Sequence, residues 1–93
     1  SKKNAISSAE IDNSAVNLMQ ADRFDSFCEK YKLTEREKDV FDALVNTENS
    51  IQEISDALYI SRRTCQRHIT SIYEKLGVKS RMGLYQVYLT GED

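Results

Sequence analysis

The sequence lacks the residues that build metal sites, disulfide frameworks and phosphate-binding loops. Its 93 residues include one His, two Cys, three Gly, no Trp and no Pro. One His and two distant Cys are too few for a zinc-finger or zinc-ribbon ligand set. Two lone cysteines make no disulfide framework, which favours a reducing compartment, and glycines that never cluster exclude a glycine-rich phosphate loop. We therefore expect a protein that holds neither a metal nor another cofactor.

Long hydrophobic runs are also missing. No stretch approaches the roughly 18 apolar residues of a membrane span, and no signal-peptide pattern opens the chain. We expect a soluble, cytoplasmic piece, although a longer parent protein could be anchored in a membrane. Such a parent is expected because the first residue is Ser and not Met. The composition, 40% hydrophobic and 30% charged, is that of one small globular domain with an arm.

Apolar residues recur at helical spacings, and convincing strand alternation is absent, so we expect an all-α fold. Four helices are predicted after Lys32, each preceded by a residue that can cap its first N–H groups. The capping residues are Thr34, Ser50, Ser61 and Ser80. Glu37 and Glu53 complete two capping boxes. Gly77 ends the third helix, about residues 62–76, and the fourth covers 81–90. The short second helix and the longer third form a helix-turn-helix.

The first third of the chain is expected to be an appendage to this bundle. Residues 1–20 are predicted to be a linker or N-terminal arm that is partly helical. Residues 21–31 are predicted to form an amphipathic helix, because its aromatic and thiol side chains fall at i, i+3, i+4 and i+7. These side chains are Phe24, Phe27, Cys28 and Tyr31. We expect the stripe to dock on the domain of residues 32–90; the alternative is that it faces a partner chain or a missing domain.

Positive charge is concentrated in one segment, although the whole chain has a formal net charge of −2. Residues 61–81 hold six Lys or Arg against one acid, Glu74, whereas residues 33–60 hold two basic and seven acidic residues. At physiological salt, screening limits the range over which exposed charges interact to about 8–10 Å, so the charge of a local patch matters more than the net charge of the chain. The basic segment predicts a nucleic-acid contact; the alternative is an ordinary solvated helix face.

The predicted third helix has two opposed faces. The apolar stripe consists of Cys65, Ile69, Ile72 and Leu76. The opposite face carries groups that can hydrogen-bond to base edges, since Arg pairs with guanine, Gln with adenine, and Thr meets the thymine methyl. The predicted base contacts are Arg63, Gln66, Arg67 and Thr70. Ser61, Arg62, Thr64 and Ser71 are predicted to contact phosphates, helped by the free N–H groups at the start of the helix.

Short motifs follow one another in register across residues 32–89. They are Leu33-Thr34-Glu35-Arg36-Glu37, Glu53-Ile54-Ser55 with Leu58, Ile60-Ser61-Arg62-Arg63-Thr64, His68-Ile69, Ile72, Lys75-Leu76-Gly77-Val78 and Ser80-Arg81. Together they resemble the LuxR-type, or GerE-like, helix-turn-helix domain. The resemblance implies a four-helix module that binds double-stranded DNA and usually ends a bacterial transcription regulator. An upstream sensor domain in the parent chain is implied as well.

The resemblance also implies roles for single residues. Gln66, Arg67 and Thr70 fall where such domains address bases. The positions at or near the DNA backbone are Thr64, Lys75 and Lys79. The last helix looks like the element through which these domains often pair, which implies a homodimer. Its predicted interface residues are Leu84, Tyr85 and Tyr88, with half-buried core positions as the alternative for both tyrosines. Arg36 and Glu37 look like a structural pair, a surface ion-pair former and a capping partner.

Two other functions stay open at this point. A helical protein-interaction module would use the Phe24, Phe27 and Tyr31 stripe together with the last helix. A sigma-factor-like promoter-reading domain shares the helix-turn-helix and would bind RNA polymerase. No acid–His–Ser arrangement is present at a useful spacing, so we expect no enzyme. Buried packing is favoured over a redox role for Cys28 and Cys65, and over a phosphate contact for His68.

Overall fold

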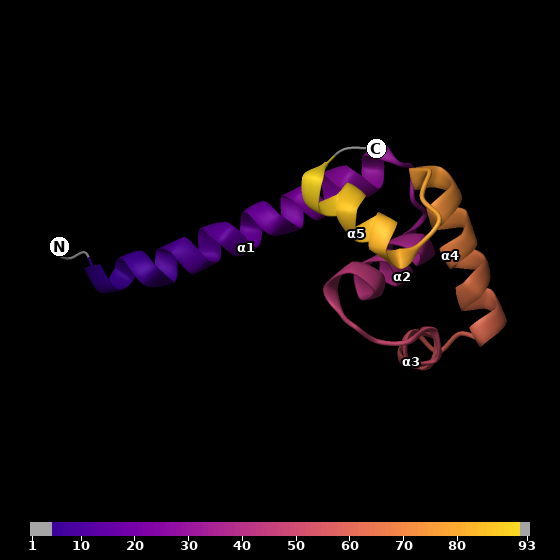
Figure 1. Ribbon diagram of the computed structural model, residues 1–93. Coiled ribbons are helices and arrows are strands. Elements are labelled where there is room, and N and C mark those ends of the chain that lie inside the picture. The colour runs from indigo at the N-terminus through magenta and orange to yellow at the C-terminus, as the bar shows by residue number, and fades with distance from the viewer. Residues whose placement is uncertain (1–4, 92–93) are drawn as a thin grey trace.

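The structure is a computed structural model in which residues 5–91 are described, with side chains from residue 15 onward. It contains five helices and, within these residues, no strand (Figure 1). The helices are α1 (Ala5–Lys30), α2 (Glu35–Asn46), α3 (Ile51–Ala57), α4 (Arg62–Leu76) and α5 (Arg81–Thr90). The expected all-α fold is confirmed, and α4 and α5 have the predicted bounds. None of the described helices is both long and apolar enough to cross a membrane.

The first helix is longer and more continuous than the sequence suggested. The predicted arm of residues 1–20 and the predicted helix of residues 21–31 merge into α1 from residue 5 onward, while residues 1–4 lie outside the described part. No Pro occurs in the chain and the first Gly is Gly77, so no helix-breaking residue separates the two segments. The N-terminal part of α1 projects from the bundle (Figure 1) and gives the structure an elongated shape, with overall extents of 54 × 29 × 21 Å.

The C-terminal part of α1 docks on α2 and α5 through its aromatic stripe. The rings of Phe24 and Phe27 stack on Phe41 of α2, with centroid distances of 5.6 and 5.4 Å. Tyr88 of α5 meets the same three rings edge-on, and Cys28 is 1% exposed. The Arg23 guanidinium donates to the backbone oxygen of Tyr88 near the end of α5, where the helix dipole favours a cation. The stripe therefore packs within the chain and does not present itself to a partner.

Local capping fixes where the other helices begin and end. The Thr34 hydroxyl accepts from the Glu37 N–H at 3.2 Å, and the Glu37 carboxylate accepts from the Thr34 N–H at 3.0 Å. The capping box of α3 has the same reciprocal bonds. Gly77 ends α4 with φ +71°, a conformation that costs other residues a Cβ clash. The predicted caps are confirmed at all four helix starts.

The core lies where α2, α3, α4 and α5 meet. Its central members are exposed by 2% or less, and all four helices contribute. These residues are Val40, Phe41, Leu44, Ile54, Cys65, Ile69, Ile72 and Leu84. Because α2, α3 and α5 pack against one side of α4, its other side stays free.

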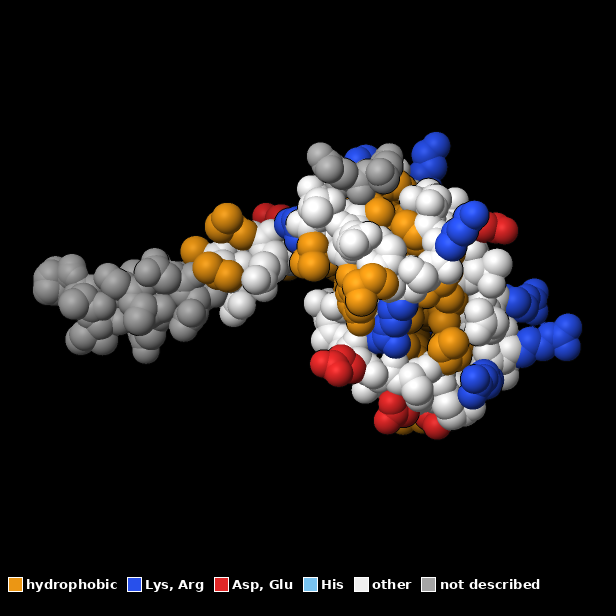
Figure 2. Space-filling view, viewed as in Figure 1, with side chains coloured by type: hydrophobic (Ala, Val, Ile, Leu, Met, Phe, Trp, Pro, Cys, Tyr) orange, Lys and Arg blue, Asp and Glu red, His pale blue; other side chains and the backbone are white. Residues whose placement is uncertain are grey.

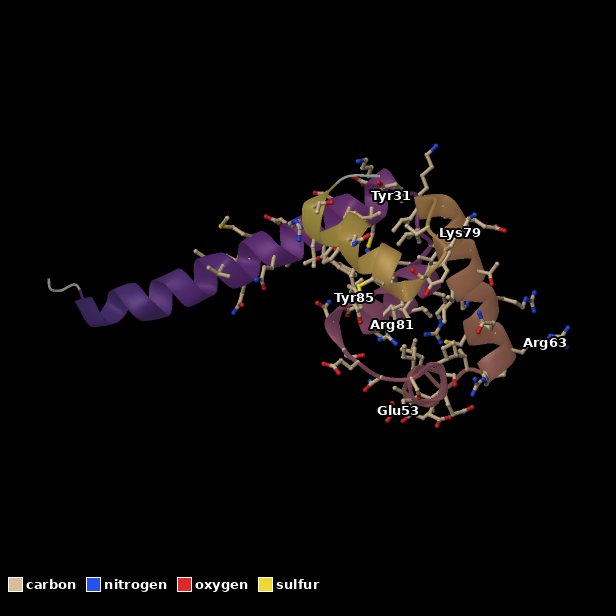
Figure 3. The ribbon with its side chains drawn as sticks, in the orientation of Figure 1. Tyr31, Glu53, Arg63, Lys79, Arg81 and Tyr85 are labelled. Carbon is tan, nitrogen blue, oxygen red and sulfur yellow. The ribbon has the colours of Figure 1, made fainter. Side chains whose placement is uncertain are left out.

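Arg81 ties the start of α5 to the end of α2, a role that the sequence analysis did not identify. Its guanidinium points inward (Figure 3) and donates to the carbonyl oxygens of Leu44 at 3.1 Å, Thr47 at 2.7 Å and Asn49 at 2.6 Å. A fourth contact reaches the carbonyl of Ala43 at 3.5 Å. The last carbonyls of a helix, such as that of Leu44, lack partners within the helix, and Thr47 and Asn49 lie in the loop that follows α2. Arg81 therefore supplies donors both to the end of α2 and to this loop.

Candidate nucleic-acid interface

The two faces of α4 are separated as the sequence predicts. Its apolar stripe is buried, from 0% exposure at Cys65 and Ile72 to 3% at Leu76. The side chains of Arg63, Gln66, Arg67 and Thr70 are all exposed. The helix runs along the outer edge of the bundle (Figure 1), and Arg63 extends away from the protein (Figure 3). A shallow open hollow lies between these side chains, so nothing in the described chain covers them.

The outer face of α4 is cationic at its N-terminal half. Arg63 and Arg67 have no ion-pair or hydrogen-bond partner among the described residues. Arg62 makes a long contact to the Gln52 side chain at 3.5 Å. Lys and Arg side chains project from this edge, whereas acidic ones gather at the lower end of the molecule in the view (Figure 2). Glu74 is the acid of α4 and lies near its C-terminal end.

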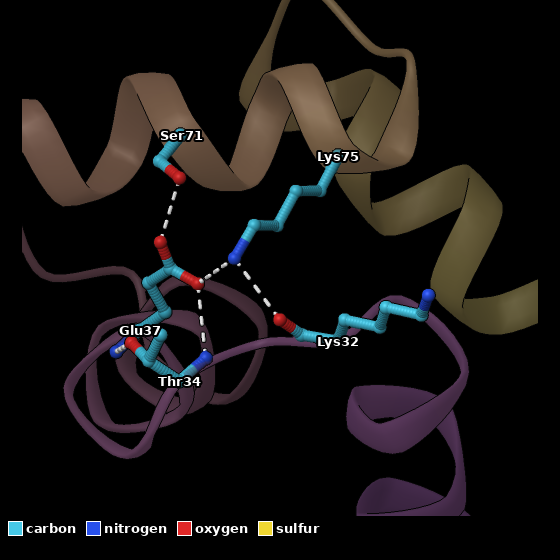
Figure 4. Close-up of polar contacts among 5 residues, drawn as sticks. All are labelled: Lys32, Thr34, Glu37, Ser71 and Lys75. Carbon is cyan, nitrogen blue, oxygen red and sulfur yellow. Dashed lines mark hydrogen bonds and ion pairs between the residues drawn. The ribbon is translucent and has the colours of Figure 1, made fainter.

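The six predicted phosphate contacts separate into two groups. Arg62 and Lys79 are exposed, and Ser61 and Thr64 exchange hydrogen bonds at the start of α4, where the first N–H groups are free. Ser71 and Lys75 instead turn toward α2, where both bond to the carboxylate of Glu37 (Figure 4). Fewer cations are unpaired than the charge count of residues 61–81 indicates, because the Arg81 guanidinium and the ammonium of the exposed Lys75 are bonded to acceptors of the same chain.

Glu37 is a buried carboxylate that α4 surrounds with donors. It is 6% exposed, and it accepts from Ser71 Oγ and from Lys75 Nζ, each at 2.6 Å. Burial opposes ionisation of Glu37, but the hydrogen bonds it accepts outweigh burial and lower its pKa from 4.5 to about 2. The capping role predicted for Glu37 is confirmed, and Arg36 forms the expected surface ion pair, with Asp39 at 3.4 Å.

The bonds from α4 to Glu37 were missed in the sequence, although a weak signal exists. Ser71 and Lys75 are four residues apart and flank the buried stripe of α4. Side chains at that spacing share one face of a helix, so they can grip a single group on a neighbouring element. The sequence does not indicate that the neighbour is Glu37, which lies 34 and 38 residues away.

The three predicted pairing residues of α5 lie at different depths in the structure. Leu84 is 0% exposed and belongs to the core, so its side chain is out of reach of a second chain. Tyr85 donates to the Thr47 carbonyl at 3.4 Å, and Tyr88 lies in the aromatic cluster with α1. The exposed apolar side chains of α5 are instead Met82, at 64%, and Leu89, at 70%. Both tyrosines are half-buried, the alternative considered for them.

The two cysteines are buried, in keeping with a packing role. Burial raises the pKa of the Cys28 thiol from 9.0 to about 11 and also raises the pKa of Cys65. Both thiols therefore stay protonated near neutral pH and are poor nucleophiles. His68 is half-buried. Across residues 15–91 no three His, Cys, Asp or Glu side chains are grouped so that they could hold a metal ion.

Comparison with known proteins assigns the helical bundle to a family. Residues 31–88 match the family described as bacterial regulatory proteins, luxR family. The chain is 44% identical over 55 residues to the spore germination protein GerE of Bacillus subtilis (strain 168), covering 59% of this chain and 73% of that protein. It is 41% identical over 51 residues to the uncharacterized transcriptional regulatory protein YhcZ of the same organism, covering 55% of this chain but 23% of that protein. No solved structure matches.

Proposed function

Because the chain belongs to the LuxR family of bacterial regulatory proteins, we propose that it binds specific sequences in double-stranded DNA by inserting α4 into the major groove. The observation that carries this proposal is the division of α4 into a buried apolar stripe and a bare polar face. A helix that docks in the major groove needs an apolar face that packs on the rest of the domain and a polar face that contacts the bases. DNA-binding regulation itself is the function of the family.

The exposed side chains of α4 suit different parts of the duplex. Arg67, which has no partner among the described residues, can approach guanine O6 and N7 as a fork. Gln66 and Thr70 lie one turn apart beside it and can reach neighbouring base pairs, while Arg63 covers the edge of the same face. Arg62, Lys79 and the free N–H groups after Ser61 are placed to hold phosphates, which fix the register without reading sequence.

Two copies of the chain are proposed to bind together through α5. From Met82 to Gly91 the sequence contains no charged residue, so two identical surfaces can meet without like-charge repulsion. The proposed contacts are the exposed Met82 and Leu89, in place of the buried Leu84. Such a dimer would address two half-sites about one turn of DNA apart. The chain would act as the C-terminal domain of a cytoplasmic regulator whose upstream region senses a signal.

Selection of bound sites from random duplex DNA tests this function. We expect an enriched motif with two-fold symmetry and half-sites about 10 base pairs apart. Recovery of unenriched sequences, or no retention of duplex at all, would refute the proposal. A pull-down with purified RNA polymerase in the absence of DNA separates the promoter-reading alternative, which predicts stable retention. The protein-interaction alternative is weakened because Phe24 and Phe27 pack on Phe41 and are not free.

A further inference from the structure

We propose that Glu37 and Lys75 are positioning residues for DNA recognition. In this proposal the pair fixes the angle at which α4 presents its reading face, and Lys75 does not contact phosphate. The proposal rests on the proposed function, since a reading face has meaning only if α4 enters the groove. It adds a role to residues that touch no base.

The first observation is that one carboxylate holds two successive turns of α4. Ser71 Oγ donates to Oε2 of Glu37, and Lys75 Nζ donates to Oε1, each at 2.6 Å. The carboxylate is in turn held by the Thr34 N–H at 3.0 Å, at the start of α2 (Figure 4). Glu37 is 6% exposed, whereas the side chain of Lys75 is 31% exposed. The bonds therefore meet at a buried carboxylate, where charge-assisted hydrogen bonds have defined length and direction.

The second observation is that Lys75 also reaches a point outside α2. Its Nζ donates to the backbone oxygen of Lys32 at 3.0 Å, in the turn between α1 and α2. Lys32 has φ +58°, a left-handed conformation that a non-glycine residue rarely adopts. The C-terminal half of α4 is therefore fastened at two separate places, the first turn of α2 and the turn that precedes it.

The buried stripe of α4 fixes which side of the helix faces the core, since a large rotation would expose Ile69 and Ile72. Apolar contacts are non-directional, however, so they constrain a rotation of a few degrees less tightly than hydrogen bonds do. The bonds from Ser71 and Lys75 are directional and resist that rotation. Gln66, Thr70 and Glu74 follow one another at intervals of one turn along the outer side of α4. A small rotation of the helix at Lys75 therefore displaces its whole base-contacting face.

The chain contains its own control for this role. Glu53 occupies the same place in the capping box of α3 that Glu37 occupies in α2, and accepts from the Ser50 N–H at 2.7 Å. Glu53 is exposed and receives no bond from α4. Because Gln also completes a capping box, the variants Glu37→Gln and Glu53→Gln both keep their caps. Only Glu37→Gln weakens the grip on α4.

The experiment measures the dissociation constants of both variants and of Lys75→Met for the selected site and for an unrelated duplex. Temperatures are used at which circular dichroism shows each variant folded. We expect Glu37→Gln and Lys75→Met to lose affinity for the selected site by about tenfold or more, the value of one base contact, and to keep their affinity for the unrelated duplex within about twofold. Glu53→Gln should leave both affinities unchanged.

Salt dependence gives a second readout for Lys75. We expect Lys75→Met to leave the slope of log K against log salt unchanged, whereas a lost phosphate contact would change it by about 0.9 for each bound chain. That change, or an equal loss on both duplexes, would overturn the proposal. If Glu37→Gln does not fold, Ser71→Ala removes one bond and carries the same test. If the unsubstituted chain does not prefer the selected site over the unrelated duplex, both proposals are overturned. If it does and the variants keep that preference, only the positioning role of Glu37 and Lys75 is overturned.

Discussion

Replacing Arg81 by Met is expected to destabilise the bundle strongly without touching the core. The guanidinium makes two short bonds, to the carbonyls of Thr47 and Asn49 at 2.7 and 2.6 Å, and a third to Leu44 at 3.1 Å. Hydrogen bonds to a charged group contribute about 1.5–3 kcal/mol each and are not additive. Met fills a similar volume but donates nothing, so we expect the free energy of unfolding to fall by about 3–5 kcal/mol.

Urea denaturation followed by circular dichroism measures this loss, and the dependence on urea should be unchanged. Arg36→Met is the matched control, because Arg36 makes an ion pair only with the half-exposed Asp39 at 3.4 Å. An exposed pair of this kind contributes about 0–1 kcal/mol. Arg81→Lys keeps the charge but loses the fork, and should fall between parent and Arg81→Met. A loss below about 1 kcal/mol for Arg81→Met, or equal losses at both arginines, would refute the reasoning.

Three further predictions concern buried groups. The lowered pKa of Glu37 means that its contribution is complete above pH 4.5 and is lost as the pH falls toward 2; the shift amounts to about 3 kcal/mol. Urea titrations at several pH values should show this acid loss in the parent and not in Glu37→Gln. Ile69→Ala should lower the unfolding free energy by about 2–4 kcal/mol through a core cavity, and a normal melting temperature would contradict the burial of that stripe. The Cys65 thiol should react with a thiol reagent only as fast as the protein opens, so rapid labelling of the native chain would contradict its 0% exposure.

Local signals were sufficient to predict the helices of the bundle. A hydroxyl three residues before Glu37 or Glu53 specifies a helix start by bonds within four residues, and Gly77 specifies an end in the same way. The two faces of α4 follow from its period alone. The length of α1 was not predicted, because its N-terminal part has no strong apolar stripe and no breaker marks a boundary.

The side chains that turn inward could not be assigned from sequence. Lys75 and Arg81 are of the same residue types as Lys79 and Arg63, whose side chains make no bond within the described residues. The partners of Lys75 and Arg81 lie between 32 and 43 residues away. Only the packing of α2 against α4 and α5 decides which cations face a carbonyl or carboxylate. Leu84 shows the same difficulty for an apolar residue. The sequence predicted that one apolar face of α5 serves both packing and pairing, whereas in the structure Leu84 on this face is buried in the core.

The central claim is that the outer face of α4 reads bases, and Arg67→Ala tests it most directly. Affinities of parent and variant should be compared on the selected site and on duplexes that carry each single base substitution. We expect a loss of about 1–3 kcal/mol that vanishes when one particular base pair is changed, with an unaltered melting temperature because Arg67 is exposed and unpartnered in the described chain. Equal weakening on every duplex would show that Arg67 contacts phosphate, and no weakening on any duplex would contradict the assignment of α4 as the reading helix.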